Sequence, residues 1–484
     1  MRVPVPSRPR QAGPLSPFGL AAAFALILAA VAPAKAAPDD PYFKSKGAWG
    51  QKHDDQWGLK RIGLTAEKDS AWALLGPKPQ PVVVAVIDTG LDWNHLDFDW
   101  NNLWRNPKEI PDNGTDDDGN GYVDDIIGWD FLANVNTPFD HDGHGTLTAG
   151  IIAAASDNKI GIAGVNPHAR IMVLKALNAF GQTRASYIAK AIVYAADNGA
   201  RIVNLSVGHP TLTRIEQAAI AYARKKGVLI VVAAGNAGIE TGGFGLASAE
   251  GVLTVAATNP DDSHPGFSNW GPEVDIAAPG VDILSLRARR TDTLFGIPGV
   301  EYAAGTAYVG EDKRYYRAGG TSFAAPFVAG VASLLLSKQP ELTVDQLERI
   351  LMQSAEDIQT PGLDQFSGAG LVNARRALTL DPAFSIEAAV TGVEVVQASG
   401  KPAIKVLGTA AANAFKSAKL EIGEGEDPAK FKTVVKKVSA VAGGALGVIP
   451  AKEFGGSSVW TIRLVVSHRN GETREARFVL DVGG

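Results

Sequence analysis

The chain has 484 residues, with 46 Lys and Arg against 51 Asp and Glu, a formal net charge of −5, and no cysteine. Its 45% hydrophobic and 20% charged residues are typical of a globular protein, not of a disordered or coiled-coil chain. The lack of cysteine excludes a disulfide scaffold, a Cys-ligated zinc site, an iron–sulfur cluster and a thiol nucleophile. The mildly acidic balance argues against nucleic-acid binding.

The N-terminus has the pattern of an export signal. Arg2, Arg8 and Arg10 precede an apolar run over residues 18–31, and the small-residue site Ala-Lys-Ala follows at 34–36. An uncleaved membrane anchor is the alternative, but the run is short for a membrane span of about 20 residues. We therefore predict a signal peptide over residues 1–36, no stable membrane anchor, and a secreted protein, either extracellular or periplasmic.

Residues 37–380 alternate short β-branched runs with amphipathic stretches. The runs that predict buried parallel strands are 82–87, 171–174, 202–205, 228–234 and 252–256. Helices are predicted over 185–198 and 212–226, and each is followed by a glycine, Gly199 or Gly227. This alternation predicts an α/β fold, a mostly parallel sheet covered by helices on both faces.

The pattern changes after Asp381. Strands are predicted at 390–396, 419–422, 459–466 and 473–482, and Asn470-Gly471 between the last two is a strong hairpin signal. We predict a second domain over 384–484, a small antiparallel β-sandwich, whose binding partner the sequence does not indicate.

Three local motifs carry candidate catalytic residues, each at the end of a predicted strand or the start of a predicted helix. Asp88 ends the first strand in Val-Ile-Asp-Thr-Gly, and His144 lies in Gly-His-Gly-Thr before an apolar stretch. Ser322 follows Gly-Gly-Thr where a helix is expected to begin. A fourth residue, Asn236, lies in the glycine-rich run Ala-Gly-Asn-Ala-Gly.

These residue types together suit nucleophilic catalysis. A serine hydroxyl needs an imidazole to take its proton, and the imidazole needs a buried acid to orient it and stabilise its charged form. The resulting oxyanion needs donors, which the Ser322 backbone N–H and the Asn236 side chain could supply. Each residue alone has a structural alternative as a helix cap or turn residue, but the conjunction favours catalysis.

The order Asp88, His144, Asn236, Ser322, with these flanking residues, closely resembles the subtilisin-like serine protease family. The resemblance runs from about residue 41 to 377 and includes the runs 202–206, 275–280 and 319–336. It implies a serine endopeptidase acting on proteins or peptides. Asp88 would orient His144, His144 would act as base and then acid, Ser322 would form the acyl-enzyme, and Asn236 would donate into the oxyanion hole.

The resemblance also implies two extended segments that pair with the substrate backbone as added strands. They are Gly181, Gln182 and Thr183, and Ser206, Val207 and Gly208. The chain departs from the family pattern at Leu147-Thr148, after the histidine, and at Thr183 and His209, where glycines are usual. The last two would add bulk beside the substrate channel.

An acidic loop over 112–125 contains six aspartates. Within it the spacing of oxygen ligands matches positions 1, 3, 5, 7 and 9 of a calcium loop, with Gly121 at position 6. The candidate ligands are Asp116, Asp118, Asn120, the carbonyl of Tyr122, and Asp124. Ile127 replaces the glutamate of a complete EF-hand, and a solvated acidic turn is the alternative. Because charges this dense repel one another without a cation, the pattern favours calcium.

A second calcium site is implied by the resemblance alone. Residues 156–162 match the loop after the histidine helix that binds calcium in many family members. Asp97 and Asn158 would supply side chains, and Ser156, Ile160 and Ile162 their carbonyls. The N-terminal ligand could match either Asp40 or Asp55.

The leading hypothesis is thus a secreted, calcium-stabilised serine endopeptidase. One alternative is a processing protease of narrow specificity, since the insertion between Pro279 and Gly319 could gate the cleft. A binding or adhesion protein with an inert protease core is another, although no member of the Asp88, His144, Ser322 set is missing.

Overall fold

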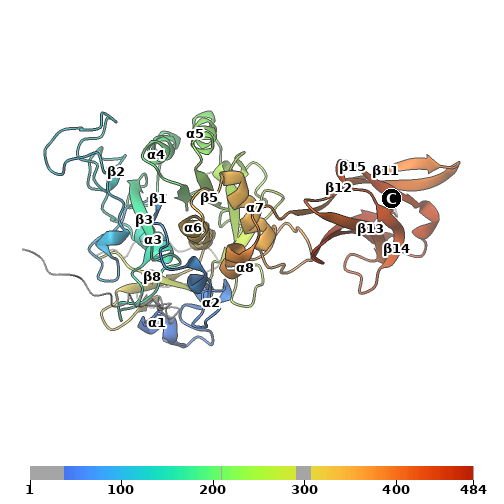
Figure 1. Cartoon of the computed structure of the whole chain (residues 1–484), viewed down its shortest axis with the longest axis horizontal. Coiled ribbons are helices and arrows are strands. Elements are labelled where there is room, and N and C mark those ends of the chain that lie inside the picture. The colour runs from blue at the N-terminus through green and yellow to red at the C-terminus, as the bar shows by residue number, and fades with distance from the viewer. Residues whose placement is uncertain (1–37, 209, 290–306, 483–484) are drawn as a thin grey trace, which may run out of the picture. The chain divides into compact units, whose positions relative to one another are not determined.

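A seven-stranded parallel sheet forms the centre of the region before residue 380. In this computed structural model, which describes residues 38–208, 210–289 and 307–482, its strand order is β2-β3-β1-β4-β5-β6-β7 (Figure 1). The strands are β1 (Val82–Asp88), β2 (Gly128–Asp130), β3 (Ala169–Lys175), β4 (Ile202–Leu205), β5 (Leu229–Ala233), β6 (Leu253–Thr258) and β7 (Ile276–Pro279). The expected signal peptide, His209 and part of the insertion lie outside the described residues.

Helices cover both faces of this sheet, as predicted (Figure 1). Strand β1 shows how, because its side chains alternate between two cores. Val84 and Val86 pack into the core shared with α3 (His144–Ala153) and α6 (Thr321–Lys338). Ala85 and Ile87 pack into the core shared with α4 (Ala185–Asp197) and α5 (Arg214–Lys225).

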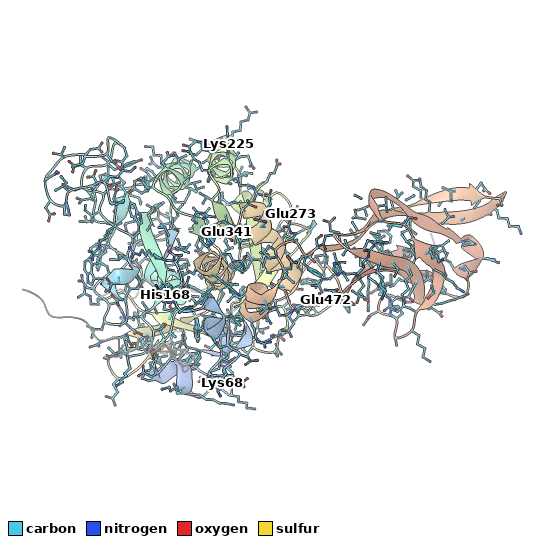
Figure 2. The ribbon with its side chains drawn as sticks, viewed as in Figure 1. Lys68, His168, Lys225, Glu273, Glu341 and Glu472 are labelled. Atoms are coloured by element: carbon cyan, nitrogen blue, oxygen red, sulfur yellow. The ribbon has the colours of Figure 1, made fainter. Side chains whose placement is uncertain are left out.

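The ends of α4 and α5 follow local sequence signals. Gly199 and Gly227 adopt positive φ angles of 83° and 84° just beyond the helices. Helix α5 begins two residues later than expected because Thr213 and Glu216 form a capping box. Its polar side faces outward, and Lys225 projects into solvent (Figure 2).

Helix α6 is the longest helix among the described residues, and it is strongly apolar. It is long and apolar enough to span a membrane, yet every residue except Lys338 is buried inside the protein. Burial on all sides explains its nearly uniform hydrophobicity. It is therefore the central core helix, and its first turn carries Ser322.

Shorter elements surround this core. The remaining helices are α1 (Pro41–Lys44), α2 (Trp57–Arg61), α7 (Val344–Ser354) and α8 (Ala374–Thr379), with 3₁₀ turns at Ala71–Leu75, Trp100–Asn102, Gly245–Ser248 and Ala451–Glu453. The insertion contributes an antiparallel sheet, in the order β8-β10-β9, of β8 (Ile283–Leu286), β9 (Tyr308–Val309) and β10 (Tyr315–Ala318). Ser285 on β8 donates to the carbonyl of Leu147, which attaches this sheet to α3.

Two antiparallel sheets form the C-terminal region, as predicted. One has the order β11-β12-β15 and the other β14-β13-β16-β17. Their strands are β11 (Ile386–Ala398), β12 (Lys401–Ala412), β13 (Phe415–Glu424), β14 (Lys432–Val438), β15 (Val441–Pro450), β16 (Val459–His468) and β17 (Thr473–Asp481). Val406 and Ile449 of the first sheet share one buried core with Leu420 and Leu464 of the second. The domain boundaries at 380 and 384 stay predictions.

The hairpin expected at Asn470-Gly471 joins β16 to β17, and Gly471 has a φ of 98°. Strands β12, β14 and β15 were not predicted, because their alanines, glycines and lysines give weak strand signals.

Candidate active site

The four candidate catalytic residues lie at the carboxyl end of the parallel sheet. Asp88 is the last residue of β1, which lies between β3 and β4 in the middle of the sheet. His144 opens α3 and Ser322 lies in the first turn of α6, while Asn236 follows β5. Strands β2 and β3 lie on one side of β1, and β4 to β7 lie on the other side. A doubly wound sheet is expected to form a crevice where the strand order reverses in this way.

Asp88 and His144 form a buried carboxylate–imidazole pair. His144 Nδ1 lies 2.8 Å from Asp88 Oδ1 and 3.0 Å from Asp88 Oδ2. The Asp88 side chain is fully buried, whereas the His144 side chain keeps 21% exposure. A proton on Nδ1, donated to the carboxylate, leaves Nε2 free to act as a base.

The charge environment of His144 favours its protonated form. Burial by itself lowers the pKa of His144, but the charge of Asp88 and its hydrogen bond, with further contributions from Asp142 and Asp140, raise that pKa to about 9. Burial also raises the pKa of Asp142 to about 6. The Asp88–His144 pair is therefore arranged to accept a proton and hold it.

Ser322 is hydrogen-bonded to Ser206, in the segment that follows β4. Its Oγ donates to the carbonyl oxygen of Ser206 at 3.1 Å, and Ser206 Oγ donates to the carbonyl oxygen of Ser322 at 2.8 Å. The ring of Phe323 packs at 5.2 Å from the ring of His144, which places the imidazole beside the start of α6. Among the described residues the Ser322 hydroxyl bonds to Ser206 and not to His144. Catalytic hydrogen bonds often form only when substrate is bound.

Asn236 is held by the oxygen of its side-chain amide. Asn236 Oδ1 accepts from the backbone N–H of Thr321 at 2.8 Å and from Thr321 Oγ1 at 2.9 Å. The amide NH₂ group is therefore on the side away from Thr321 and keeps its donors for a ligand. Asn269 supports this loop, because its Nδ2 donates to Ala234 and its Oδ1 accepts from Ala237.

Asp140 is a structural centre of the site that the sequence did not reveal. Its fully buried carboxylate accepts hydrogen bonds from Thr89 Oγ1, from the backbone N–H groups of Asp142, Gly143 and Thr146, and from Thr146 Oγ1, at 2.7–2.9 Å. Thr89 Oγ1 in turn accepts from the N–H of Gly145. The only sequence signal is an acid just before a helix start, which favours a capping role.

Lys175, at the end of β3, was also missed. Its buried ammonium donates to the carbonyl oxygens of Thr89 and of Phe139, the latter at 3.0 Å. Burial lowers the pKa of Lys175, while the nearby carboxylates of Asp140, Asp130 and Asp88 act in the opposite direction. Lys175 thereby joins the loop after Asp88 to the loop before His144.

The two expected substrate segments follow β3 and β4. Both backbone groups of Gln182 are hydrogen-bonded to Asn178. The Asn178 N–H donates to the Gln182 carbonyl and Asn178 Oδ1 accepts the Gln182 N–H, both at 3.0 Å. Gly181 also donates to the Asn178 carbonyl, and Thr183 Oγ1 donates to Ala176. Ser206 and Val207 are buried, and Gly208 is exposed.

The acidic loop gathers part of the expected ligand set and adds one residue to it. Ligand atoms of Glu109, Asp116 and Asp118 all lie within 4.8 Å of one another. Asp124 instead accepts from the N–H groups of Asn113 and Gly114, at 3.1 and 2.9 Å. Glu109 lies outside the loop spacing and gave no sequence signal.

The loop over 156–162 lies against Asp97 and bonds to both of its side-chain oxygens. Asn158 Nδ2 donates to Asp97 Oδ1 at 2.8 Å, and the Ile162 N–H donates to Asp97 Oδ2 at 2.9 Å. Asp40 accepts from the N–H groups of Asp157 and Asn158, whereas Asp55 accepts from Ser45, Ala48 and Gln51 in the N-terminal segment. The structure thus brings Asp40, and not Asp55, to this loop. Burial raises the pKa of Asp97 to about 7.

Comparison with known proteins identifies the family that the chain resembles. The Subtilase family (Peptidase_S8) matches residues 80–370. A thermophilic serine proteinase from Bacillus sp. (strain AK1) is 35% identical, over 70% of this chain and 72% of its own. Thermitase from Thermoactinomyces vulgaris is 32% identical, over 70% of this chain and 99% of its own. A solved protease from Pseudoalteromonas arctica PAMC 21717 shares the fold with a TM-score of 0.52 and 26% identity, over 70% of this chain and 98% of its own.

The family match spans more than half of the chain, and the fold, a parallel sheet with helices on both faces, is the one shared with the solved protease. The protein therefore belongs to the subtilase family and is a serine endopeptidase, which acts on proteins or peptides.

Proposed function

We propose that this protein cleaves peptide bonds with Asp88, His144 and Ser322 as a catalytic triad. The observation that carries the proposal is the carboxylate–imidazole pair at 2.8 Å, beside a serine in the first turn of a buried helix. Ser322 Oγ attacks the scissile carbonyl, and His144 Nε2 takes its proton. His144 then gives this proton to the leaving amine. Water next attacks the acyl-enzyme carbonyl while His144 takes its proton, and His144 returns that proton to Ser322 Oγ as the carboxylic acid product leaves.

Asn236 and the Ser322 N–H serve as the oxyanion donors in this proposal. The anchored Oδ1 of Asn236 supports it, because an amide oriented by one atom presents the other without reorganisation. Gly181, Thr183 and the segment 206–208 pair with the substrate backbone. Gln182 contributes less to this pairing, because its backbone groups are already bonded to Asn178.

Calcium stabilisation is part of the same proposal. The residues present fit the cation at two places: the carboxylates of Glu109, Asp116 and Asp118, and the Asp97–Asn158–Asp40 loop. Both offer oxygen ligands, the type that calcium prefers. The apolar, basic-flanked N-terminus supports export, with removal of residues 1–36 and a secreted enzyme.

The test compares the mature wild type with Ser322→Ala, on a casein substrate and with an organophosphonate probe. We expect the variant to lose turnover by several orders of magnitude and to lose covalent labelling, with an unchanged circular dichroism spectrum. Thr321→Ser serves as the matched control, because it keeps the hydroxyl that bonds to Asn236. A folded Ser322→Ala protein that still cleaves peptides would refute the triad.

A further inference from the structure

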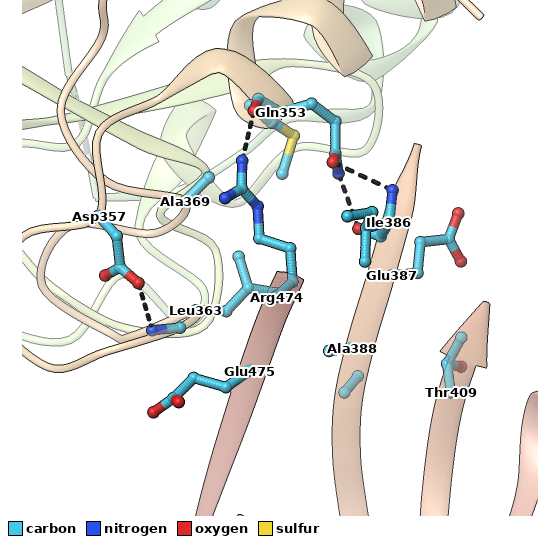
Figure 3. Close-up of a pocket in the computed structure, with 13 residues that line it drawn as sticks. Gln353, Asp357, Leu363, Ala369, Ile386, Glu387, Ala388, Thr409, Arg474 and Glu475 are labelled. Atoms are coloured by element: carbon cyan, nitrogen blue, oxygen red, sulfur yellow. Dashed lines mark hydrogen bonds between the residues drawn. The ribbon is translucent and has the colours of Figure 1, made fainter. Parts of the chain in front are cut away.

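A cavity of about 250 Å³ lies where the protease region meets the β-sandwich (Figure 3). The end of α7, the loop over 357–369, the start of β11 and the start of β17 line it. Most of its wall is apolar and includes Met352, Leu363, Ala369, Ile386 and Ala388. Cavities at such junctions are common ligand sites, and this volume suits a small ligand.

One cation, Arg474, reaches into this apolar surface (Figure 3). Its Nη2 donates to the carbonyl oxygen of Gln353 at 2.5 Å, and among the described residues no carboxylate lies within ion-pair distance of its guanidinium. Burial lowers the pKa of Arg474, with a smaller contribution from the charge of Arg376. The charges of Glu472 and Asp357 partly offset that of Arg474, and Glu387 and Glu475 also line the cavity. A guanidinium with one neutral acceptor nevertheless keeps unused donors.

Neighbouring arginines of the same sheet are balanced differently. Arg477 donates to Glu475 at 2.9 Å and to Asp427 at 2.8 Å. Arg463 donates to Glu421 at 2.6 Å. These two arginines therefore pair with acids, while Arg474 in the cavity wall bonds to a backbone carbonyl.

The residue that accepts from Arg474, Gln353, is itself fixed by hydrogen bonds. The side chain of Gln353 bonds to both backbone groups of Ile386: its Nε2 donates to the carbonyl at 3.0 Å, and its Oε1 accepts the N–H at 3.2 Å. The Gln353 carbonyl, held in this way, orients the guanidinium. Asp357 also lines the cavity, and its Oδ2 accepts from the N–H of Gly362 at 2.9 Å. A preorganised arginine is the usual partner of a carboxylate, which it can bind with two parallel hydrogen bonds.

The geometry points to a binding site for an apolar carboxylate, whose anionic end pairs with Arg474 and whose hydrocarbon part lies against Met352, Leu363 and Ile386. Two sources share this chemistry: the C-terminal residue of a cleaved peptide, and a short fatty acid. The site is separate from the catalytic residues and does not rest on the proposed triad.

The test is calorimetric titration of the full-length Ser322→Ala protein. This variant is used so that no ligand bound at the active site undergoes turnover. The probes are N-acetyl-leucine, its amide, and hexanoate. We expect N-acetyl-leucine to bind and the amide to bind at least about tenfold more weakly, because the amide lacks the charge. Binding of hexanoate as well would identify an apolar carboxylate of either source, and binding of hexanoate alone a fatty acid. Equal binding of acid and amide would overturn the proposal.

Variants locate the binding. Arg474→Gln should weaken N-acetyl-leucine binding about tenfold or more, and Arg474→Lys should weaken it less, since it keeps the charge without the fork. Because Arg474 is half-buried, its substitution can also affect folding. A second pair of variants is therefore made at Leu363, which lines the cavity and is 56% exposed. Leu363→Asp should weaken binding of the acid more than Leu363→Asn does. Unchanged affinity in both Arg474→Gln and Leu363→Asp would place the ligand elsewhere and refute the site.

Discussion

His144 illustrates how single residues decide the chemistry of this site. Its imidazole is mostly buried, which disfavours charge, but it faces the fully buried carboxylate of Asp88 at 2.8 Å and lies near Asp140 and Asp142. The carboxylates dominate, so the folded protein holds the proton on His144 more tightly than a free imidazole does. In the proposed mechanism, the same interaction that stabilises the imidazolium must be overcome before His144 can act as a base.

We therefore predict an alkaline pH dependence. Since the pKa of His144 rises from 6.5 to about 9, kcat/KM on an uncharged peptide should increase as pH rises through this interval. The sign for stability is opposite: the raised pKa stabilises the fold below about pH 6.5, and that contribution is lost as pH rises through about 9. A pH–rate profile and denaturant titrations at several pH values measure both.

Asp88→Asn is the matched variant for this prediction. It removes the charge that raises the pKa of His144, so the inflection should move to lower pH while kcat falls strongly. An inflection at the same pH in both proteins would show that Asp88 does not control the titration of His144.

At the scale of elements, the start of α3 depends on one carboxylate and on close backbone contacts. Asp140 accepts five hydrogen bonds, which come from the loop after β1, from the loop before α3 and from the first turn of α3. Gly145 is required because a Cβ there would lie 2.2 Å from the carbonyl oxygen of Gly90. Helix α3 can thus approach β1 closely enough for His144 to reach Asp88.

Asp140→Asn should destabilise the fold by about 2–4 kcal/mol and lower kcat. The amide removes the charge and turns an NH₂ group toward donors, which leaves buried N–H groups without an acceptor. Urea unfolding and initial rates measure the two effects. Asp99→Asn is the control, because Asp99 is exposed and caps a short turn through one bond to Asn101 at 2.8 Å. We expect it to cost within about 1 kcal/mol. Equal losses in the two variants would contradict the role given to Asp140.

At the scale of the whole molecule, a chain without cysteine needs other links between distant segments. Asp40 bonds to the loop over 156–162, more than a hundred residues away in sequence, and Asp97 joins the same loop. The acidic cluster of Glu109, Asp116 and Asp118 lies within one stretch of the chain, where a bound cation would hold a single loop. Because a cation bound only to the native state stabilises it by mass action, these loops can replace disulfides in that role.

Chelation should lower the melting temperature. Calcium at about 100 times its dissociation constant stabilises the fold by about 2.7 kcal/mol per site, which corresponds to roughly 3–4 °C for a domain of this size. The effect of Asp116→Asn on stability should depend on calcium. The variant should be less stable than the wild type in calcium, but equally or more stable in chelator, because like-charge repulsion is relieved. Calorimetry with calcium and with chelator measures this.

Asp261→Asn, at an exposed position, provides the matched control and should shift the melting temperature equally in both conditions. A wild-type melting temperature that is the same with and without calcium would contradict calcium stabilisation.

Much of the fold was predictable from local pattern. The β-branched runs ending at Asp88 and Leu205 and the glycines after α4 and α5 each determine an element through nearby residues alone. The sandwich was only partly predicted, because β12 and β14 depend on pairing with neighbouring strands more than on their own composition. Family and activity followed from four residues whose order and flanking residues are specific.

The sequence by itself determined the types and order of the candidate catalytic residues, the parallel sheet and the acidic loop, because these are encoded in short runs. Only the tertiary structure decided that Asp140 and Lys175 connect the loops of the site, that Glu109 joins Asp116 and Asp118, and that Arg474 faces a cavity. Each of these depends on contacts between segments distant along the chain or on burial. A charged residue in isolation looks the same in a solvated turn as in a buried network, and folding alone distinguishes the two.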